Sequence, residues 1–166
     1  HKRYLIIQDR PVLYYSLKAF EDSAVDEIVL VVGKGEEEFC RKEIVDKYGI
    51  SKVKAIVEGG KERYHSVFEG LKQTSDADYV LIHDGARPFV NQDIIRRCMQ
   101  EVQKYQACVV GMPVKDTIKI ADEEGYAKQT PDRKNVWMIQ TPQTFSYALI
   151  YEAYEEMLKT EDTAIT

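Results

Sequence analysis

Residues 83–88, with the sequence His-Asp-Gly-Ala-Arg-Pro, carry the strongest chemical signal in the chain. They end an apolar run, residues 79–83, that predicts a buried strand, and open α/β sheets bind ligands at the carboxyl ends of their strands. There the Asp84 carboxylate could hold a ribose hydroxyl or a metal–phosphate complex, and Arg87 could fork onto phosphate oxygens. The competing interpretation is a turn with an incidental surface ion pair.

A second candidate site is the glycine pair Gly59-Gly60, between a predicted strand at 53–57 and a predicted helix at 62–73. Two glycines permit the backbone to approach a ligand closely. Ser66, one turn into the helix, could hydrogen-bond a base. An ordinary turn is the alternative interpretation. A Walker loop is excluded, because its Gly-Lys-Ser order is absent.

Polar side chains also gather late in the chain. Thr117, Lys119 and Arg133 could together bind a phosphate, although runs of charge more often form a solvated surface. Residues 140–145, with the sequence Gln-Thr-Pro-Gln-Thr-Phe, place polar side chains around a proline and could form a pocket wall.

Strand and helix patterns alternate along the first two thirds of the chain. Residues 1–7 resemble the entrance to a strand, and Pro11 fits the first turn of a helix. Asn91 is a plausible N-cap for a helix at 92–105. Repeated strand–helix–strand units predict a mainly parallel sheet covered by helices. The strands are expected at 27–33, 53–57, 79–83 and 107–112, and further helices at 36–48, 62–73 and 146–158.

The pattern changes after Pro113. Residues 117–121 alternate like a strand, residues 122–125 form a turn signal, and residues 126–129 could return as a second strand. This predicts a protruding β-hairpin arm at about 117–129. A lone hairpin is marginal in water, and its apolar positions Ile118, Ile120 and Tyr126 need a place to be buried. We therefore expect a homodimer.

Length and composition restrict the class of protein. The 166 residues suit one domain, which we place at 1–166. A net charge of −5 argues against binding to nucleic acid, but small anions need only a few local cations. No stretch approaches the roughly 20 apolar residues of a membrane helix. Cys40, Cys98 and Cys108 are not spaced like metal ligands, so a reduced, cytoplasmic chain is expected.

Together, in this order, the four motifs resemble the 2-C-methyl-D-erythritol 4-phosphate cytidylyltransferases of the non-mevalonate isoprenoid pathway. The resemblance implies a Rossmann-like three-layer α/β/α nucleotidyltransferase fold. It also implies transfer of CMP from CTP to methylerythritol phosphate, with release of pyrophosphate.

The resemblance further implies roles for individual residues. Lys2 and Arg133 would be catalytic, and Asp84 would also hold Mg²⁺ or another divalent cation. The nucleotide would be bound by Gly59, Gly60, Lys61, Ser66, Asp84 and Gly85. The polyol phosphate would be bound by Arg87, Thr117, Arg133 and Thr141.

The family's arm clasps a neighbouring subunit, so Thr117 and Arg133 are expected in the partner's active site. The family's glycine-rich loop would precede Lys2, and a second lysine would follow Thr166, so we expect further segments on both sides. Two alternatives stay open: a ribitol-5-phosphate cytidylyltransferase, with the same fold and donor, and a non-catalytic nucleotide-binding module. A Rossmann dehydrogenase is disfavoured, since no Gly-x-Gly-x-x-Gly follows a strand.

Overall fold

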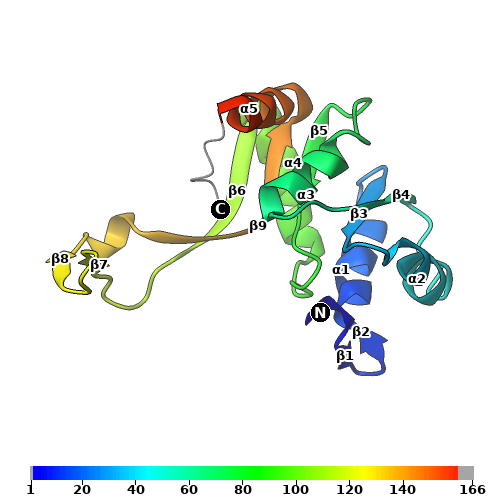
Figure 1. The fold of residues 1–166 in the computed structure, drawn as a ribbon, viewed down its shortest axis with the longest axis horizontal. Helices are drawn as coiled ribbons and strands as arrows, with labels where there is room; N and C mark the ends of the chain where they lie inside the picture. The colour runs from blue at the N-terminus through cyan, green and yellow to red at the C-terminus, as the bar shows by residue number, and fades with distance from the viewer. Residues whose placement is uncertain (1, 161–166) are drawn as a thin grey trace.

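The computed structural model describes residues 2–160. Figure 1 shows a body of strands and helices from which one long arm projects. Strands β3 (Ile28–Val32) and β4 (Val53–Glu58) form a parallel pair. A second sheet has the order β5-β9-β6, built from β5 (Tyr79–Ile82), β9 (Trp137–Ser146) and β6 (Ala107–Pro113).

The fold is α/β with mixed strand pairing. β9 runs antiparallel to both β5 and β6, so the pair β3–β4 is the one parallel ladder in the part of the chain that the structure describes. The expected mainly parallel sheet is therefore not confirmed. The physical reason lies in the arm, which turns the chain straight back after β6, and strands joined in this way pair antiparallel.

Helices occupy the ranges expected from the sequence. They are α1 (Val12–Glu21), α3 (Arg63–Leu71), α4 (Gln92–Tyr105) and α5 (Tyr147–Thr160). The helix expected at 36–48 is divided into α2 (Glu37–Cys40) and a π-helical stretch, η2 (Arg41–Asp46). Asn91 caps α4 as predicted, because its side-chain oxygen accepts a 2.9 Å hydrogen bond from the Ile94 N–H.

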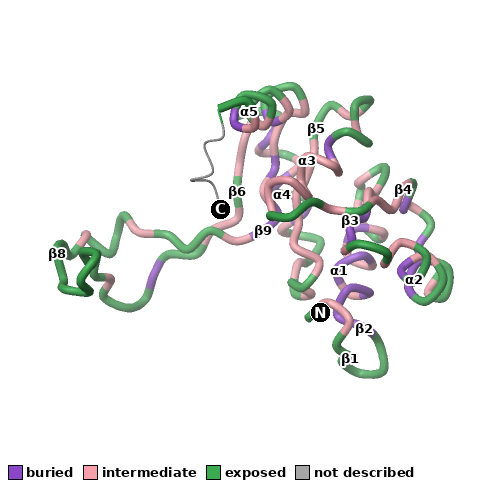
Figure 2. The backbone as a smooth tube through the Cα atoms, viewed as in Figure 1, coloured by how far each residue is buried: buried purple, intermediate pink, exposed green. Residues whose placement is uncertain are grey.

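A hydrophobic core cluster lies where α1 packs on the parallel pair. It joins Leu13 and Leu17 of α1 to Leu30 and Val32 of β3, and to Ile44 of η2. In Figure 2 the buried segments concentrate in this part of the body, while the arm is mostly exposed. The core thus holds β3 and the first part of β4 against α1.

The chain before α1 differs from the strand entrance that residues 1–7 suggested. Lys2–Tyr4 form a 3₁₀ turn, η1, and a small hairpin follows, with strands β1 (Ile6–Ile7) and β2 (Arg10–Pro11). Its turn residues Gln8 and Asp9 have φ values of 48° and 68°. Two residues with positive φ give the twist that a tight hairpin favours. His1 lies outside the described residues.

The arm comprises residues 114–136, between β6 and β9. A backbone hydrogen bond of 3.1 Å from Val114 to Val136 joins its two ends at the base. Its far end carries the short antiparallel strands β7 (Ile120–Ala121) and β8 (Ala127–Gln129), and Figure 1 shows this pair well away from the body. A 3₁₀ turn, η3 (Arg133–Asn135), lies on the returning side. None of the helices within residues 2–160 has the length and apolar character needed to cross a bilayer.

Candidate active site

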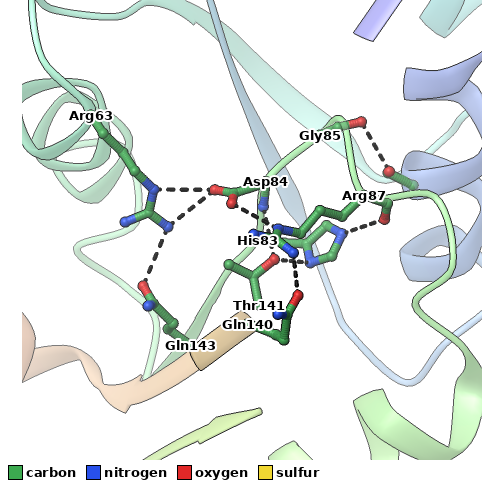
Figure 3. Close-up of polar contacts among 9 residues, drawn as sticks. Arg63, His83, Asp84, Gly85, Arg87, Gln140, Thr141 and Gln143 are labelled. Carbon is green, nitrogen blue, oxygen red and sulfur yellow. Dashed lines mark hydrogen bonds and ion pairs between the residues drawn. The ribbon is translucent and has the colours of Figure 1, made fainter. Parts of the chain in front are cut away.

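Asp84 lies two residues after the end of β5, with an arginine on each side (Figure 3). Arg63 Nε donates to Asp84 Oδ1 over 3.1 Å, and Arg87 Nε donates to Asp84 Oδ2 over 3.1 Å. The cluster brings two positive charges against one negative, and about a third of the Asp84 side chain is exposed. The arrangement therefore favours an anionic ligand.

Both arginines also contact glutamines of β9. Arg63 Nη2 donates to Gln143 Oε1 over 3.3 Å, and Arg87 Nη1 donates to Gln140 Oε1. Residues 83–87 and 140–143, which are far apart in sequence, are thus parts of one site, since β9 pairs with β5. None of residues 140–145 lines either of the two cavities described below, so their interpretation as a pocket wall stays a prediction.

Arg63 is a site residue to which sequence reasoning gave no role. It is the first residue of α3, and its guanidinium links that helix to Asp84 and to β9. Its only sequence signal is its position three residues after the glycine pair. Spacing alone does not reveal that Arg63 reaches across to the end of another strand.

His83 and Thr141 form a second layer behind Asp84. The Thr141 hydroxyl lies 2.9 Å from His83 Nδ1 and accepts a 3.2 Å hydrogen bond from the Asp84 N–H. The Thr141–Pro142 peptide bond is cis. Burial lowers the pKa of the His83 imidazole, although a hydrogen bond with the Arg87 carbonyl acts in the opposite direction.

The predicted nucleotide residues at the glycine pair surround one cavity. A hollow of about 580 Å³ lies at the ends of β3 and β4, and Arg3 also contributes to its wall. The glycines are required for packing against α3, since a Cβ on Gly59 would lie 2.5 Å from Ser66 Oγ and one on Gly60 would lie 2.3 Å from the His65 Cβ. The predicted residues that line the hollow are Gly59, Gly60, Lys61 and Ser66.

A larger cavity of about 670 Å³ lies beside the first, between β3 and β5. Asp84 and Gly85 line it, and Ser66 contributes to the walls of both cavities. The Gly85 carbonyl accepts a 3.0 Å hydrogen bond from the Ser16 hydroxyl, which ties this loop to α1. The structure thus joins the six predicted nucleotide residues in one continuous region.

Lys2 lies on the exposed turn η1, which is anchored at its other residues. Arg3 pairs with Glu36, and the Tyr4 hydroxyl donates to the same carboxylate over 2.7 Å. The Gly33 N–H also donates to it, over 2.9 Å. Burial alone would raise the pKa of Glu36, but these donors together hold it below its ordinary value. The turn that carries Lys2 is therefore fixed to the end of β3.

Thr117 and Arg133 do not join these residues within the chain. Both lie on the arm, where Arg133 Nη1 donates to the Lys115 carbonyl over 2.8 Å. Arg87 and Thr141, in contrast, lie in the Asp84 cluster. The predicted acceptor residues thus fall into two separate groups.

The metal expectation can be compared with the ligands that the chain offers. Within residues 2–160 no group of three or more His, Cys, Asp or Glu side chains is placed to hold a metal ion. Asp84 offers one carboxylate, which the arginines already contact. One carboxylate is enough for Mg²⁺ where the phosphates of a bound nucleotide and water molecules supply its other ligands, as is typical of nucleotide enzymes.

Comparison with known proteins agrees with the motifs. A family model described as 2-C-methyl-D-erythritol 4-phosphate cytidylyltransferase matches residues 1–166. The enzyme of that name from Lachnoclostridium phytofermentans is 48% identical over 99% of this chain and 71% of its own length. The one from Lachnospira eligens is 54% identical over 94% of this chain and 69% of its own length.

Solved structures are similar over the whole chain. A 4-diphosphocytidyl-2C-methyl-D-erythritol synthase from Anaerococcus prevotii has a TM-score of 0.86 and 34% identity, over 100% of this chain and 71% of that one. The 2-C-methyl-D-erythritol 4-phosphate cytidylyltransferase from Thermus thermophilus has a TM-score of 0.80 and 32% identity, over 99% of this chain and 75% of that one. The chain therefore belongs to the 2-C-methyl-D-erythritol 4-phosphate cytidylyltransferase family.

Proposed function

We propose that this site transfers CMP from CTP to 2-C-methyl-D-erythritol 4-phosphate, giving CDP-methylerythritol and pyrophosphate in isoprenoid precursor synthesis. One observation carries the proposal beyond the family match. The cluster Arg63–Asp84–Arg87 lies at the end of β5, between the cavity lined by nucleotide residues and strand β9. It offers cations for phosphates and a carboxylate for a ribose hydroxyl or a metal.

The chemistry needs positioning more than covalent help. An oxygen of the acceptor phosphate attacks the α-phosphorus of CTP, and the bond from that phosphorus to the bridging oxygen of pyrophosphate breaks. The protein accelerates this step by aligning the two substrates and by neutralising the phosphate charge. We assign the α-phosphate to Lys2 and the acceptor phosphate to Arg87. A nucleophilic Ser–His or Cys–His pair is not required.

The two cavities suggest where the parts of CTP bind. We place the cytosine beside Gly60, Lys61 and Ser66, and the ribose beside Asp84 and Gly85, because these residues line adjoining hollows. Bound Mg²⁺ would neutralise charge on the triphosphate, with Asp84 as its protein ligand. A cytoplasmic location is part of the proposal, supported by the free thiols of all three cysteines.

The arm supports a homodimer with shared sites. Large apolar side chains are exposed on the arm and on the outer part of the β6–β9 ladder, and exposed apolar surface of this kind can mark an interface between proteins. A second copy would cover this surface and would place Thr117 and Arg133 in the partner's acceptor site. The exposed apolar residues are Met112, Ile120, Tyr126, Trp137, Met138 and Ile139.

An acceptor and donor panel tests the function. Pyrophosphate release by the natural full-length protein would be followed with CTP, ATP, GTP and UTP, each with methylerythritol phosphate and with ribitol 5-phosphate. We expect turnover with CTP and methylerythritol phosphate. Equal activity with ATP or GTP, or turnover with ribitol phosphate alone, would overturn the proposed specificity. Nucleotide binding without turnover would favour a non-catalytic module.

A further inference from the structure

His83 uses both of its ring nitrogens inside the site. Nδ1 lies 2.9 Å from Thr141 Oγ1, and Nε2 lies 3.0 Å from the Arg87 carbonyl oxygen. The ring also packs against Phe20 of α1, with the centroids 5.2 Å apart. Figure 3 shows the imidazole between Thr141 and the Arg87 backbone. The side chain is therefore held from three directions.

The chemistry of the partners fixes the direction of each hydrogen bond. A carbonyl oxygen only accepts, so His83 Nε2 must carry a proton toward Arg87. In the neutral ring Nδ1 then accepts, and the Thr141 hydroxyl donates to it. The same hydroxyl oxygen accepts from the Asp84 N–H over 3.2 Å. One continuous chain of hydrogen bonds thus runs from the Asp84 backbone to the Arg87 backbone.

We propose that His83 is a positioning residue, which holds the Arg87 backbone directly and the Asp84 backbone through Thr141. This inference rests on the proposed function, in which Arg87 binds the acceptor phosphate and Asp84 lies on the nucleotide side. The loop from 83 to 87 carries both groups, and the hydrogen bonds of His83 fix their separation. His83 does not contact a reacting atom in this role.

A consequence follows for Thr141. Its hydroxyl hydrogen is used by His83 and one of its oxygen lone pairs by Asp84, so one lone pair remains. Thr141 is then able to accept a hydrogen bond from a hydroxyl of the polyol, but not to donate one to a phosphate oxygen. In the proposed acceptor site, Thr141 would therefore bind a hydroxyl group of the polyol and not its phosphate.

Two substitutions separate the functions of the ring nitrogens. In His83→Gln the side-chain amide can replace the Nε2–H donor to Arg87, whereas in His83→Asn the side-chain oxygen can replace the Nδ1 acceptor. We expect His83→Asn to raise the acceptor KM about three- to tenfold, the range for one lost hydrogen bond, with the CTP KM within about twofold. His83→Gln keeps the donor to Arg87 but loses the acceptor for Thr141, so it should leave the acceptor KM close to wild type and raise the CTP KM. Circular dichroism melting would establish that both variants fold.

Several outcomes would overturn the proposal. One is an equal rise in both KM values for both variants. Another is a rise in the acceptor KM that is as large in His83→Gln as in His83→Asn. The third is no change in either KM for either variant. If a variant does not fold, the wild-type protein still gives a test. Nitrogen-15 NMR of labelled histidine should show the Nε2–H tautomer at His83, and an Nδ1–H tautomer would contradict the network. Absence of cytidylyl transfer by the wild type would refute the proposed function, while the tautomer would still report on the network.

Discussion

The two arginines beside Asp84 also contact different glutamines, Gln143 for Arg63 and Gln140 for Arg87. We expect the two arginines to have different roles, because they also reach Asp84 from different sides. Arg63 reaches Asp84 from α3, on the nucleotide side, whereas Arg87 follows Asp84 on the loop and is nearly half exposed. Arg87 keeps N–H groups that neither Asp84 nor Gln140 uses, and these can meet a phosphate. A lysine has no planar fork and cannot hold all of these partners at once.

We therefore expect Arg87→Lys to raise the acceptor KM roughly tenfold or more, because a charge-assisted forked contact contributes about 1.5–3 kcal/mol. The CTP KM should change little. Steady-state kinetics with each substrate varied would measure both. Arg97→Lys is a matched control, since Arg97 pairs with Asp93 on an exposed face of α4. A change confined to the CTP KM would show that Arg87 is wrongly assigned.

Gly60 offers a test of the nucleotide cavity. A methyl group there would lie 2.3 Å from the His65 Cβ, so the loop or α3 must move. Gly60→Ala should lower the free energy of unfolding by about 1–3 kcal/mol and weaken CTP binding, because the moved segment lines the cavity. Thermal melting and calorimetric titration with CTP would measure the two effects. Gly111→Ala is the control, since the nearest atom to its added Cβ, on Trp137, would lie 3.4 Å away. Unchanged CTP binding by Gly60→Ala would contradict the placement of the nucleotide in this cavity.

At the residue scale the sequence singled out residues that the structure brings close together, but not how their side chains pair; their roles stay predictions. Asp84 and Ser66 were expected at a ligand site from their positions after a strand and in the first turn of a helix, and they line the cavities, as does Gly85, which the family resemblance added. Arg63 and His83 received no separate role. Their contacts join segments up to 80 positions apart in sequence, and such contacts depend on a strand order that local spacing does not contain.

At the scale of elements, local patterns located the helices well, because their apolar spacing is local and some of them also carry boundary signals. Asn91 caps α4 through its side chain, for example. The β1–β2 hairpin was missed because its turn residues, Gln8 and Asp9, are not the Asn-Gly or Asp-Gly pair that usually marks such a turn. The direction of β9 was missed for a different reason. Strand periodicity is the same in parallel and antiparallel ladders, and only the return of the arm determines the pairing.

Glu21 connects two elements and gives a pH-dependent prediction. It ends α1, and its carboxylate accepts hydrogen bonds from the Ser51 and Lys52 N–H groups, each over 2.9 Å, just before β4. Burial alone would raise the pKa of Glu21, but the hydrogen bonds from Ser51 and Lys52 outweigh it and lower the pKa. A lowered folded-state pKa stabilises the fold above the unfolded value of about 4.3, and this stabilisation is lost as the pH falls through the folded value.

Glu21→Gln should thus reduce the free energy of unfolding at pH 7 by about 1 kcal/mol, after allowance for solvent screening. The difference from wild type should shrink as the pH falls below about 4. Urea unfolding at a series of pH values would measure it. Glu38→Gln, which removes an exposed i,i+4 pair with Lys42, should have almost no effect at any pH. A Glu21→Gln difference that stays constant between neutral and strongly acidic pH would contradict the assignment.

At the scale of the whole molecule, the residues proposed to bind the acceptor lie in two separate places, and this separation is the reason for proposing a second copy. Arg87 lies in the body, whereas Thr117 and Arg133 lie on an arm that extends away from it. One chain with this arrangement cannot enclose a small phosphorylated polyol by all of these residues. The exposed Tyr126, Trp137 and Met138 show that the arm and its base also leave apolar surface uncovered.

Mixing two inactive variants decides whether the arm completes a neighbour's site. Lys2→Ala removes a residue of the body and Arg133→Ala removes one of the arm. If sites are shared, a mixed dimer holds one site with both defects and one with neither. With equal amounts and random exchange about half of the dimers are mixed, so about a quarter of all sites, and of the wild-type activity, should return.

Pyrophosphate release would be measured after subunit exchange, which differently tagged copies would verify by co-purification. Each variant alone, at the same total concentration, is the control. No recovery after verified exchange, or a monomer by sedimentation at the assay concentration, would rule out the shared site.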